Sequence, residues 1–445
     1  MPPPPIAADI SSPLTLPSGL ELPNRLVKAA MTERIADARN GATERHVALY
    51  SAWAEGGIGL QLTGNVQVDR RNLEAPGNVV IDAKPSNEQA ALLARWAEGA
   101  KAHGGKIMMQ LSHAGRQTMK FVNPQPDAPS ATQVGLPGGK FGVARAMSGD
   151  QIKRVIERFG LAARAAREAG FDGAQLHGAH GYLISQFLSP LVNKRDDEWG
   201  GPLENRARLL IEAVKAVKAE AGTGFAVSVK LNSADFQKGG FSTEDSAGVI
   251  ARLNKFGLDF LEISGGNYEQ PSMIGAGGLT KSAERPEPKT ETTKKREAYF
   301  LDYAQEVRGA ATMPIMVTGG FRTASVMNEA LQAGEADLIG IGRPLCVEFD
   351  APAQLISGAL DALPRWEDRL RIGPGLLSAS SPITMVRMLN AFGRQAWFYA
   401  QMHRVADGKP VDRSLGVLKT FIAMEGYDAR MAKAYHAALK DREAA

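Results

Sequence analysis

The stretch Phe225-Ala-Val-Ser-Val-Lys-Leu231 is a short, almost continuous apolar run. A helical pattern over residues 243–256 follows it, and then a second apolar run over residues 259–264. Runs of this kind are typical of strands in a parallel sheet, where both faces are covered. A strand, a helix and a strand in this order predict a parallel βαβ unit.

The same alternation extends in both directions along the chain and gives eight strand–helix units. Strands are predicted over residues 25–30, 58–62, 106–111, 172–177, 225–231, 259–264, 314–317 and 337–341. Helices are predicted over residues 43–55, 86–103, 148–169, 204–221, 243–256, 295–308, 323–332 and, more weakly, 351–360. Thr43 fits the N-cap of the first helix, and either Ser148 or Asp150 fits that of the third. Eight units predict a closed α/β fold, the (β/α)8 TIM barrel.

A doubly wound open sheet is the competing architecture. It is disfavoured because the first crossover, residues 31–57, has no glycine-rich phosphate fingerprint directly after its strand.

Three segments are expected. Residues 1–13 are Pro-rich and predicted to be disordered or extended. Residues 14–360 form the barrel, which begins with a hairpin over residues 14–22 around Ser18-Gly19. Residues 361–445 form a helical extension, with helices over 384–406 and 414–439, that packs on the barrel or on a partner subunit. Two long βα-loops, residues 112–147 and 265–294, are interpreted as lids on the carboxyl-terminal face or as disordered segments.

Composition excludes several classes of protein. The single cysteine, Cys346, excludes a disulfide framework, a cysteine-ligated iron–sulfur cluster and a Cys-rich zinc site. The 52 basic and 48 acidic residues leave a net charge of +4, too small to favour nucleic acid or a membrane as partner. No apolar run reaches the roughly 18–20 residues of a membrane span, and the start lacks the features of a signal peptide. We therefore expect a soluble cytoplasmic protein, forming a homo-oligomer, with a small-molecule substrate.

In a barrel, chemistry collects where strands end and βα-loops begin. The polar residues and glycines at these positions are Thr32, Thr63, Gln110, His177, Lys230, Ser264, Gly319, Gly320, Gly342 and Arg343. The glycine turns after the seventh and eighth strands lie at the usual phosphate site of barrels, where backbone N–H groups approach an anion. Arg343 adds a charge-assisted donor. The alternative is that these glycines only permit tight turns.

A second cluster is Leu176-His-Gly-Ala-His-Gly-Tyr182, in which His177 ends the fourth strand and His180 and Tyr182 follow closely. Imidazole N–H groups can polarise a carbonyl and a phenol can deliver a proton. A partial metal site and histidines buried for structural reasons are the alternatives, but the motif lacks a nearby carboxylate or cysteine ligand. Lys230 is also a candidate, because a charge inside an apolar strand is costly unless it meets an anion.

These residues resemble the signature of the Old Yellow Enzyme family of NADH:flavin oxidoreductases. The resemblance rests on the run from His177 to Pro190, on Asn193-Lys-Arg-Asp-Asp-Glu-Trp-Gly-Gly201 and on Glu204-Asn-Arg206. Shorter matches are Asn24-Arg-Leu26, Ala29-Ala-Met-Thr32, Gln110-Leu-Ser-His-Ala-Gly-Arg116, Thr318-Gly-Gly-Phe321 and Gly340-Ile-Gly-Arg-Pro344. Together they span roughly residues 14 to 350.

The resemblance implies a barrel that holds non-covalent FMN and uses NADH or NADPH as reductant. It implies that hydride passes from flavin N5 to an α,β-unsaturated carbonyl or nitro compound. By the resemblance, His177 and His180 hydrogen-bond the substrate oxygen, where preplaced donors stabilise developing charge, and Tyr182 protonates Cα. The implied cofactor-binding residues are Ala30, Met31, Thr32, Thr63, Gln110, Lys230, Gly319, Gly320, Gly342 and Arg343, with no metal. Thr32 matches the position beside flavin O4, and Lys230 the position beside N1 and O2.

Three positions depart from the family pattern. Ala29-Ala30 replaces the frequent Ala-Pro, Lys230 replaces a frequent Arg and so loses its bidentate fork, and His180 is Asn in some branches. The alternative function is a cluster-free flavin barrel dehydrogenase acting on amines or other substrates. An RNA-modifying flavin barrel is disfavoured because Cys346 lies past the phosphate loop, away from the expected acid.

Overall fold

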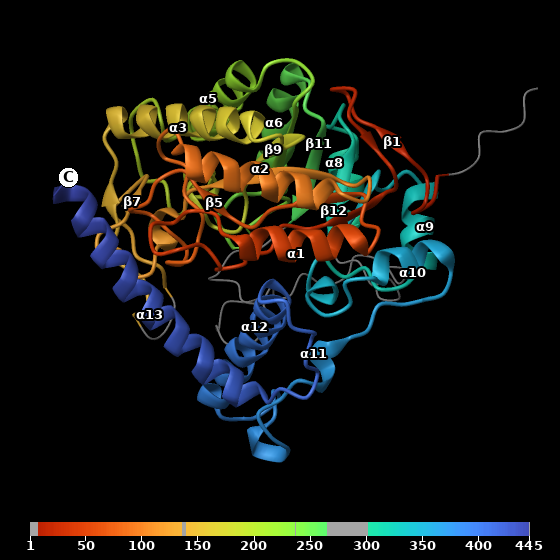
Figure 1. The fold of residues 1–445 in the computed structure, drawn as a ribbon. Helices are drawn as coiled ribbons and strands as arrows, with labels where there is room; N and C mark the ends of the chain where they lie inside the picture. Colours follow the sequence, from red (N-terminus) through yellow and green to blue (C-terminus); the bar gives the residue numbers. More distant parts are fainter. Residues whose placement is uncertain (1–7, 136–138, 236, 265–300, 445) are drawn as a thin grey trace, which may run out of the picture.

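The computed structural model describes residues 8–135, 139–235, 237–264 and 301–444. Eight parallel strands form a closed barrel, because each pairs with its neighbour and β4 also pairs with β6. The barrel strands are β3 (Leu26–Lys28), β4 (Leu60–Leu62), β6 (Lys106–Ser112), β9 (Gly173–Gly178), β10 (Ala226–Asn232), β11 (Phe260–Ser264), β12 (Ile315–Thr318) and β13 (Leu338–Ile341). The predicted (β/α)8 fold is thereby confirmed (Figure 1).

A helix follows each barrel strand. In chain order these are α1 (Glu44–Glu55), α2 (Asn87–Lys101), α3 (Gly149–Glu168), α5 (Leu203–Ala221), α6 (Thr243–Leu253), α8 (Leu301–Arg308), α9 (Ala324–Gln332) and α10 (Ala351–Ser357), with the short α4 (Leu183–Leu188) before α5. Ser148, not Asp150, caps α3, since its side chain accepts a hydrogen bond from the backbone N–H of Gln151. Thr43 occupies the N-cap of α1 as predicted.

Inward-facing side chains of the strands form an apolar layer, and the amino-terminal hairpin covers it from the amino ends of the strands, where the N–H of Ser18 donates to Asp259. The layer consists of Val27, Ala29, Leu60, Leu62, Met108, Ala226, Phe260, Met316 and Leu338. Leu16 and Leu22 of the amino-terminal hairpin, β1 (Leu14–Thr15) with β2 (Glu21–Leu22), pack against it. This end of the barrel is therefore closed by hydrophobic packing, and it leaves the opposite end for polar groups.

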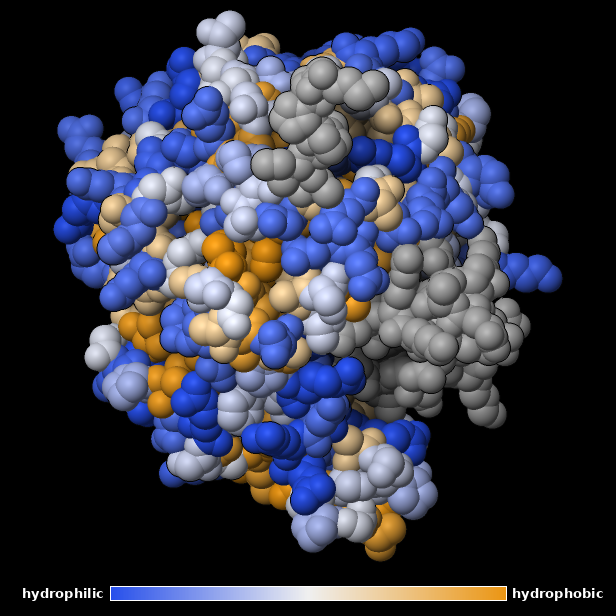
Figure 2. Space-filling view, turned by 90° about the vertical axis from the view of Figure 1, so that its right-hand side faces the viewer, coloured by the Kyte–Doolittle hydropathy of each residue, from blue (hydrophilic) through white to orange (hydrophobic). Residues whose placement is uncertain are grey.

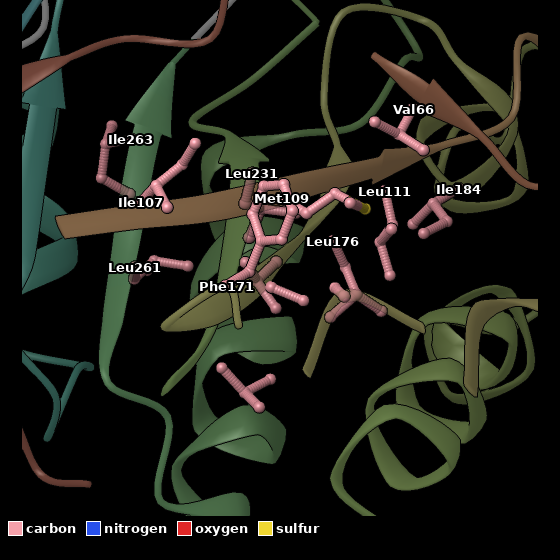
Figure 3. Packing of buried hydrophobic residues seen from close by; sticks show 14 of the residues in the cluster. Val66, Ile107, Met109, Leu111, Phe171, Leu176, Ile184, Leu231, Leu261 and Ile263 are labelled. Carbon is pink, nitrogen blue, oxygen red and sulfur yellow. The ribbon is translucent and has the colours of Figure 1, made fainter. Parts of the chain in front are cut away.

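Outward-facing side chains of the same strands pack under the surrounding helices. Met109, Leu111 and Leu176 lie in this larger cluster together with Ile184 of α4 (Figure 3). The period of two along β6 places Met108 inside the barrel and Met109 outside it. Both faces of the strands are therefore covered, as the sequence predicted for a parallel sheet.

The loop over residues 112–147 contains the 3-10 turn η1 (Gly115–Gln117) and a small parallel pair, β7 (Asp127–Ala128) with β8 (Arg145–Ala146). A short strand before α2, β5 (Val66–Gln67), pairs with the end of β6. The predicted loop over residues 265–294, the amino-terminal part of the helix predicted over 295–308 and residues 1–7 lie outside the described residues.

Two long helices dominate the segment after the barrel. These are α12 (Thr384–Ala406) and α13 (Val417–Ala444), preceded by α11 (Trp366–Arg369) and η5 (Gly375–Leu377). Figure 1 shows α12 below α1, with α13 running up one side of the barrel towards β7. His436 of α13 hydrogen-bonds the carbonyl of Phe121, so α13 contacts the long loop after β6.

Hydrophilic residues cover much of the face shown in Figure 2, with hydrophobic groups interspersed. Within the described ranges, no helix has the length and hydropathy to cross a membrane.

Candidate active site

Polar side chains replace the apolar layer at the carboxyl ends of the strands. Inward positions here hold Gln110 of β6, Gln175 of β9, Lys230 of β10, Glu262 of β11 and Thr318 of β12, and each is buried or half-buried. Each lies two positions beyond a small or apolar inward residue on its strand. The barrel therefore has an apolar floor and a polar layer above it.

Glu262 is the centre of this polar layer. Its carboxylate is fully buried and accepts three hydrogen bonds, from Nζ of Lys230 at 2.8 Å, Nε2 of Gln175 at 2.9 Å and Oγ1 of Thr318 at 2.7 Å. Nε2 of Gln110 in turn donates to Oε1 of Gln175 at 2.7 Å. A buried ion pair is tolerated when further hydrogen bonds satisfy the charges. The anion that Lys230 requires is thus supplied from the neighbouring strand.

Three rings lie together above this layer. The ring centroid of His177 is 5.0 Å from that of His180 and 4.8 Å from that of Tyr182, both in edge-to-face geometry. His177 belongs to β9, His180 to the turn after it, and Tyr182 is the N-cap residue of α4. The structure therefore brings the three predicted catalytic residues into one cluster.

His177 is held as a neutral imidazole. Burial, reinforced by the nearby Lys230 cation, lowers its pKa well below the usual value. Its Nδ1 accepts a hydrogen bond from the backbone N–H of Ala179 at 3.2 Å. Because a neutral imidazole carries one hydrogen, that hydrogen is on Nε2, where it can be donated.

His180 is fixed by two residues that end neighbouring strands. Its backbone is left-handed, with φ of 61°, and its N–H donates to Oδ1 of Asn232 at 3.1 Å. Its Nε2 lies 2.6 Å from Oγ of Ser264. Burial first, then the charge of Lys230, lowers the pKa of His180 well below the usual value. The second imidazole is therefore neutral as well, with Nε2 engaged by a hydroxyl.

The loop after β3 carries Ala30, Met31 and Thr32. Oγ1 of Thr32 donates to Oε2 of Glu74 at 2.7 Å, and Sγ of Cys346 lies 3.5 Å from Sδ of Met31. Burial raises the pKa of the Cys346 thiol to about 12, so this cysteine stays protonated.

The Thr63 hydroxyl makes two hydrogen bonds to backbone groups. Its hydroxyl donates to the carbonyl of Gly64 and accepts from the N–H of Gln110, both at 2.9 Å. The side chain thus ties the end of β4 to β6.

The glycines of the turns after β12 and β13 are needed for different reasons. Gly319 and Gly320 have φ of 119° and 89°, a region that favours glycine. A Cβ at Gly340 would lie 2.0 Å from Oγ1 of Thr318, so this glycine is required by close packing inside the barrel. A Cβ at Gly342 would meet only Sδ of Met31, at 3.8 Å, so the backbone there is open.

The turn after β13 also carries a cation. The Arg343 side chain is about half exposed, at 48%, and among the described residues it lies 3.8 Å from Oε1 of Glu367. An open glycine backbone beside a guanidinium is a donor set that fits the phosphate of FMN. Lys230 on β10, Gln110 on β6 and Thr32 in the loop after β3 supply further polar groups, which fit the polar edge of a flavin ring.

Several residues of the site carried no sequence signal of their own. Gln175, Asn232, Glu262 and Glu74 were not predicted as site residues, and Ser264 was noted only as a polar strand end. Glu74, Gln175 and Ser264 have partners 42 to 87 residues away in the sequence, so only the tertiary structure reveals these contacts.

Comparison with known proteins agrees with this geometry. The model of the NADH:flavin oxidoreductase / NADH oxidase family matches residues 9–361. The chain belongs to this family. The Old Yellow Enzyme resemblance is confirmed, and the C-terminal segment after residue 361 lies outside the match.

Among individual relatives, the NADH-dependent flavin oxidoreductase iccE of Talaromyces variabilis is 37% identical over 367 residues, covering 78% of this chain and 86% of that protein. The NADH-dependent flavin oxidoreductase iliE of Neonectria sp. (strain DH2) is 37% identical over 77% of this chain, which spans 46% of that longer protein. The Old Yellow Enzyme homologue from Zymomonas mobilis has a TM-score of 0.66 at 27% identity, covering 79% of this chain and 94% of that one.

Morphinone reductase in complex with tetrahydroNAD has a TM-score of 0.63 at 26% identity, covering 80% of this chain and 93% of that one. The protein is thus an FMN-dependent oxidoreductase of a family named for NADH as its reductant.

Proposed function

We propose that the chain reduces activated C=C bonds, in α,β-unsaturated carbonyl or nitro compounds, and that Tyr182 supplies the proton. The observation that carries the proposal is the cluster of His177, His180 and Tyr182 over the polar layer, with His177 neutral and its hydrogen on Nε2. Such a hydrogen is suited to a substrate carbonyl or nitro oxygen rather than to a metal ion.

The chain's own residues perform three tasks in this scheme. His177 Nε2–H binds the substrate oxygen and stabilises the charge that develops there, a role typically worth about 2.7–4 kcal/mol. Ser264, on the ring, and Asn232, on the backbone N–H, hold His180 beside it. Tyr182, which is 4% exposed and packed against His177, holds a phenolic proton for transfer to Cα.

We assign the cofactor to the rim of the barrel. Lys230 would face N1 and O2 of the flavin, Gln110 the pyrimidine edge, and Thr32 the O4 side of the same ring, with Ala30, Met31 and Thr63 nearby. Gly319, Gly320, Gly342 and Arg343 would face the phosphate. When bound, FMN supplies the hydride that it has received from NADH. Lys230 shares its charge with Glu262, so its effect on the flavin is smaller than that of an unpaired cation.

The test separates the two half-reactions. Tyr182→Phe should bind FMN and be reduced by NADH at the rate of the unchanged chain. Its reoxidation by an enone should slow by about 10²–10⁴-fold, the usual contribution of a general acid. Tyr435→Phe, on α13, is the matched control and should leave both steps unchanged.

A colourless protein that takes up no added FMN would contradict the proposal, and so would undiminished enone reduction by Tyr182→Phe. Amines offered as reductants in place of NADH test the alternative, a dehydrogenase. A chain that is bleached by an amine and ignores enones has that second function. A cytoplasmic location and a homo-oligomeric state stay predictions from the sequence.

A further inference from the structure

The C-terminal extension holds one residue of the loop after β3. The Arg34 guanidinium lies 4.6 Å from the ring centroid of Tyr399 on α12, and its Nη1 is 3.0 Å from Oδ2 of Asp428 on α13. The hydroxyl of Tyr427 donates to the backbone carbonyl of Arg34 at 2.7 Å. Arg34 itself has a left-handed backbone, with φ of 60°, which is rare for a residue with a long side chain. Contacts to two helices of the extension thus keep Arg34 in this position.

Arg34 connects the extension to Thr32 through one carboxylate. Its Nη2 lies 3.6 Å from Oε1 of Glu74, whose side chain is 5% exposed. The other oxygen of Glu74 accepts from Oγ1 of Thr32 at 2.7 Å and from Nδ2 of Asn65 at 3.0 Å. With a cation on one oxygen and two donors on the other, Glu74 is bound as a carboxylate that only accepts.

A threonine hydroxyl has a single proton, so the partner of that proton decides what the hydroxyl offers elsewhere. Here the proton of Thr32 is directed at Glu74. The hydroxyl oxygen of Thr32 also accepts a hydrogen bond from Nδ2 of Asn65 at 3.4 Å, which occupies one of its two lone pairs. The hydroxyl therefore has only its second lone pair, and no hydrogen, left to offer to another group.

We propose that Glu74, paired with the Arg34 that the C-terminal extension holds, is a positioning residue that directs the hydroxyl proton of Thr32 away from FMN. The inference rests on the proposed function, which places Thr32 beside the polar edge of the flavin. A hydrogen-bond donor at that edge favours the electron-rich reduced flavin, whereas a lone pair and a nearby carboxylate disfavour it. Glu74 thereby keeps the reduction potential of the bound flavin low.

The experiment measures the midpoint potential of FMN in the full-length, flavin-loaded protein by equilibration with a reference dye. Glu74→Gln keeps the shape of the side chain and removes its charge. With the amide oxygen towards Arg34, the amide N–H group faces Thr32 and releases its hydroxyl proton, so the midpoint potential should become more positive. Thr32→Ala should change it little in the unaltered chain, since Thr32 gives FMN no hydrogen there. In the Glu74→Gln background, Thr32→Ala should make the potential more negative, because it removes a hydroxyl that has been released to donate.

Asp245→Asn is the matched control, since it neutralises the carboxylate paired with Arg206 at 3.1 Å between α5 and α6 and should leave the potential unchanged. An equal lowering by Thr32→Ala in both backgrounds overturns the inference, because Thr32 would then already donate to FMN. An equal shift in Asp245→Asn also overturns it. If the protein binds no FMN, both the proposed function and this inference are overturned. If the protein reduces enones but Glu74→Gln leaves the midpoint potential unchanged, only the inference about Glu74 is overturned.

Discussion

Two buried carboxylates each contact a proposed flavin-binding residue, Glu262 with Lys230 and Glu74 with Thr32, and they are held in different ways. Glu262, inside the barrel, takes all three of its donors from strands of the same sheet: β9, β10 and β12. Glu74, on the rim, has one cation, Arg34, which also contacts residues 365 and 394 positions later in the chain. The barrel interior is thus fixed by strand register alone, whereas the rim depends on a segment outside the family match.

This difference predicts unequal costs when each carboxylate is removed. Glu262→Leu leaves Lys230, which is 3% exposed, without its anion, and should lower the free energy of unfolding by about 3–5 kcal/mol. Glu74→Leu should cost less, because Arg34 keeps Asp428 and the ring of Tyr399. Urea unfolding followed by circular dichroism measures both.

Glu262→Gln is the matched variant for the interior site. It should lie between the unaltered chain and Glu262→Leu, because an amide oxygen still accepts from Lys230. If Glu262→Leu and Glu74→Leu lowered the free energy of unfolding equally, the contacts of Arg34 with the extension would not compensate for the loss of Glu74.

Acid should act on the extension through His403 of α12. Its Nε2 lies 2.8 Å from the carbonyl of Glu33, and burial lowers its pKa to about 4. The unfolded chain takes up this proton near pH 6.5, before the folded chain does, so stability is present above pH 6.5 and is lost as the pH falls to about 4. The difference between these pKa values corresponds to about 3 kcal/mol.

The measurement compares the unaltered chain with His403→Gln at several pH values, because the buried His46 contributes equally to both and cancels. The stability advantage of the unaltered chain should shrink between pH 6.5 and 4. A constant difference over this range would show that His403 is not buried neutral against the loop after β3.

The sequence predicted the barrel closely, and the reason is local. Each strand contains an apolar run between turn residues, and the long helices have an apolar stripe, so boundaries such as those of α12 could be read directly, although its N-cap Ile383 offers no capping side chain. His177, His180 and Tyr182 were found because six consecutive residues hold all three. The sheet then had only to place this segment at a strand end.

The partners of the site could not be predicted for the opposite reason. Lys230 was expected to meet an anion, but naming Glu262 required the pairing of β10 with β11, in which the two residues stand opposite each other. Glu74 and Arg34 lie in loops, where no hydrophobic period sets the register. Their link to Asp428 depends on how α13 docks, a tertiary contact that no local pattern encodes.

The smallest predicted effect isolates that docking. Tyr427 and Tyr435 both lie on α13, and each donates a hydrogen bond of 2.7 Å to a backbone carbonyl, Tyr427 to that of Arg34 and Tyr435 to that of Arg70. Replacing either by Phe removes one hydrogen bond and should lower stability by about 1 kcal/mol. Only Tyr427→Phe loosens the loop that carries Thr32, so only this variant should release FMN severalfold faster after dilution.

Arg70 pairs with Asp82 and contacts no predicted site residue, which makes Tyr435→Phe the proper comparison. FMN release that is the same in both variants would mean that α13 stabilises the barrel without acting on the cofactor. A difference confined to Tyr427→Phe would mean that the extension acts on the flavin through the backbone of Arg34, independently of the side-chain route through Glu74.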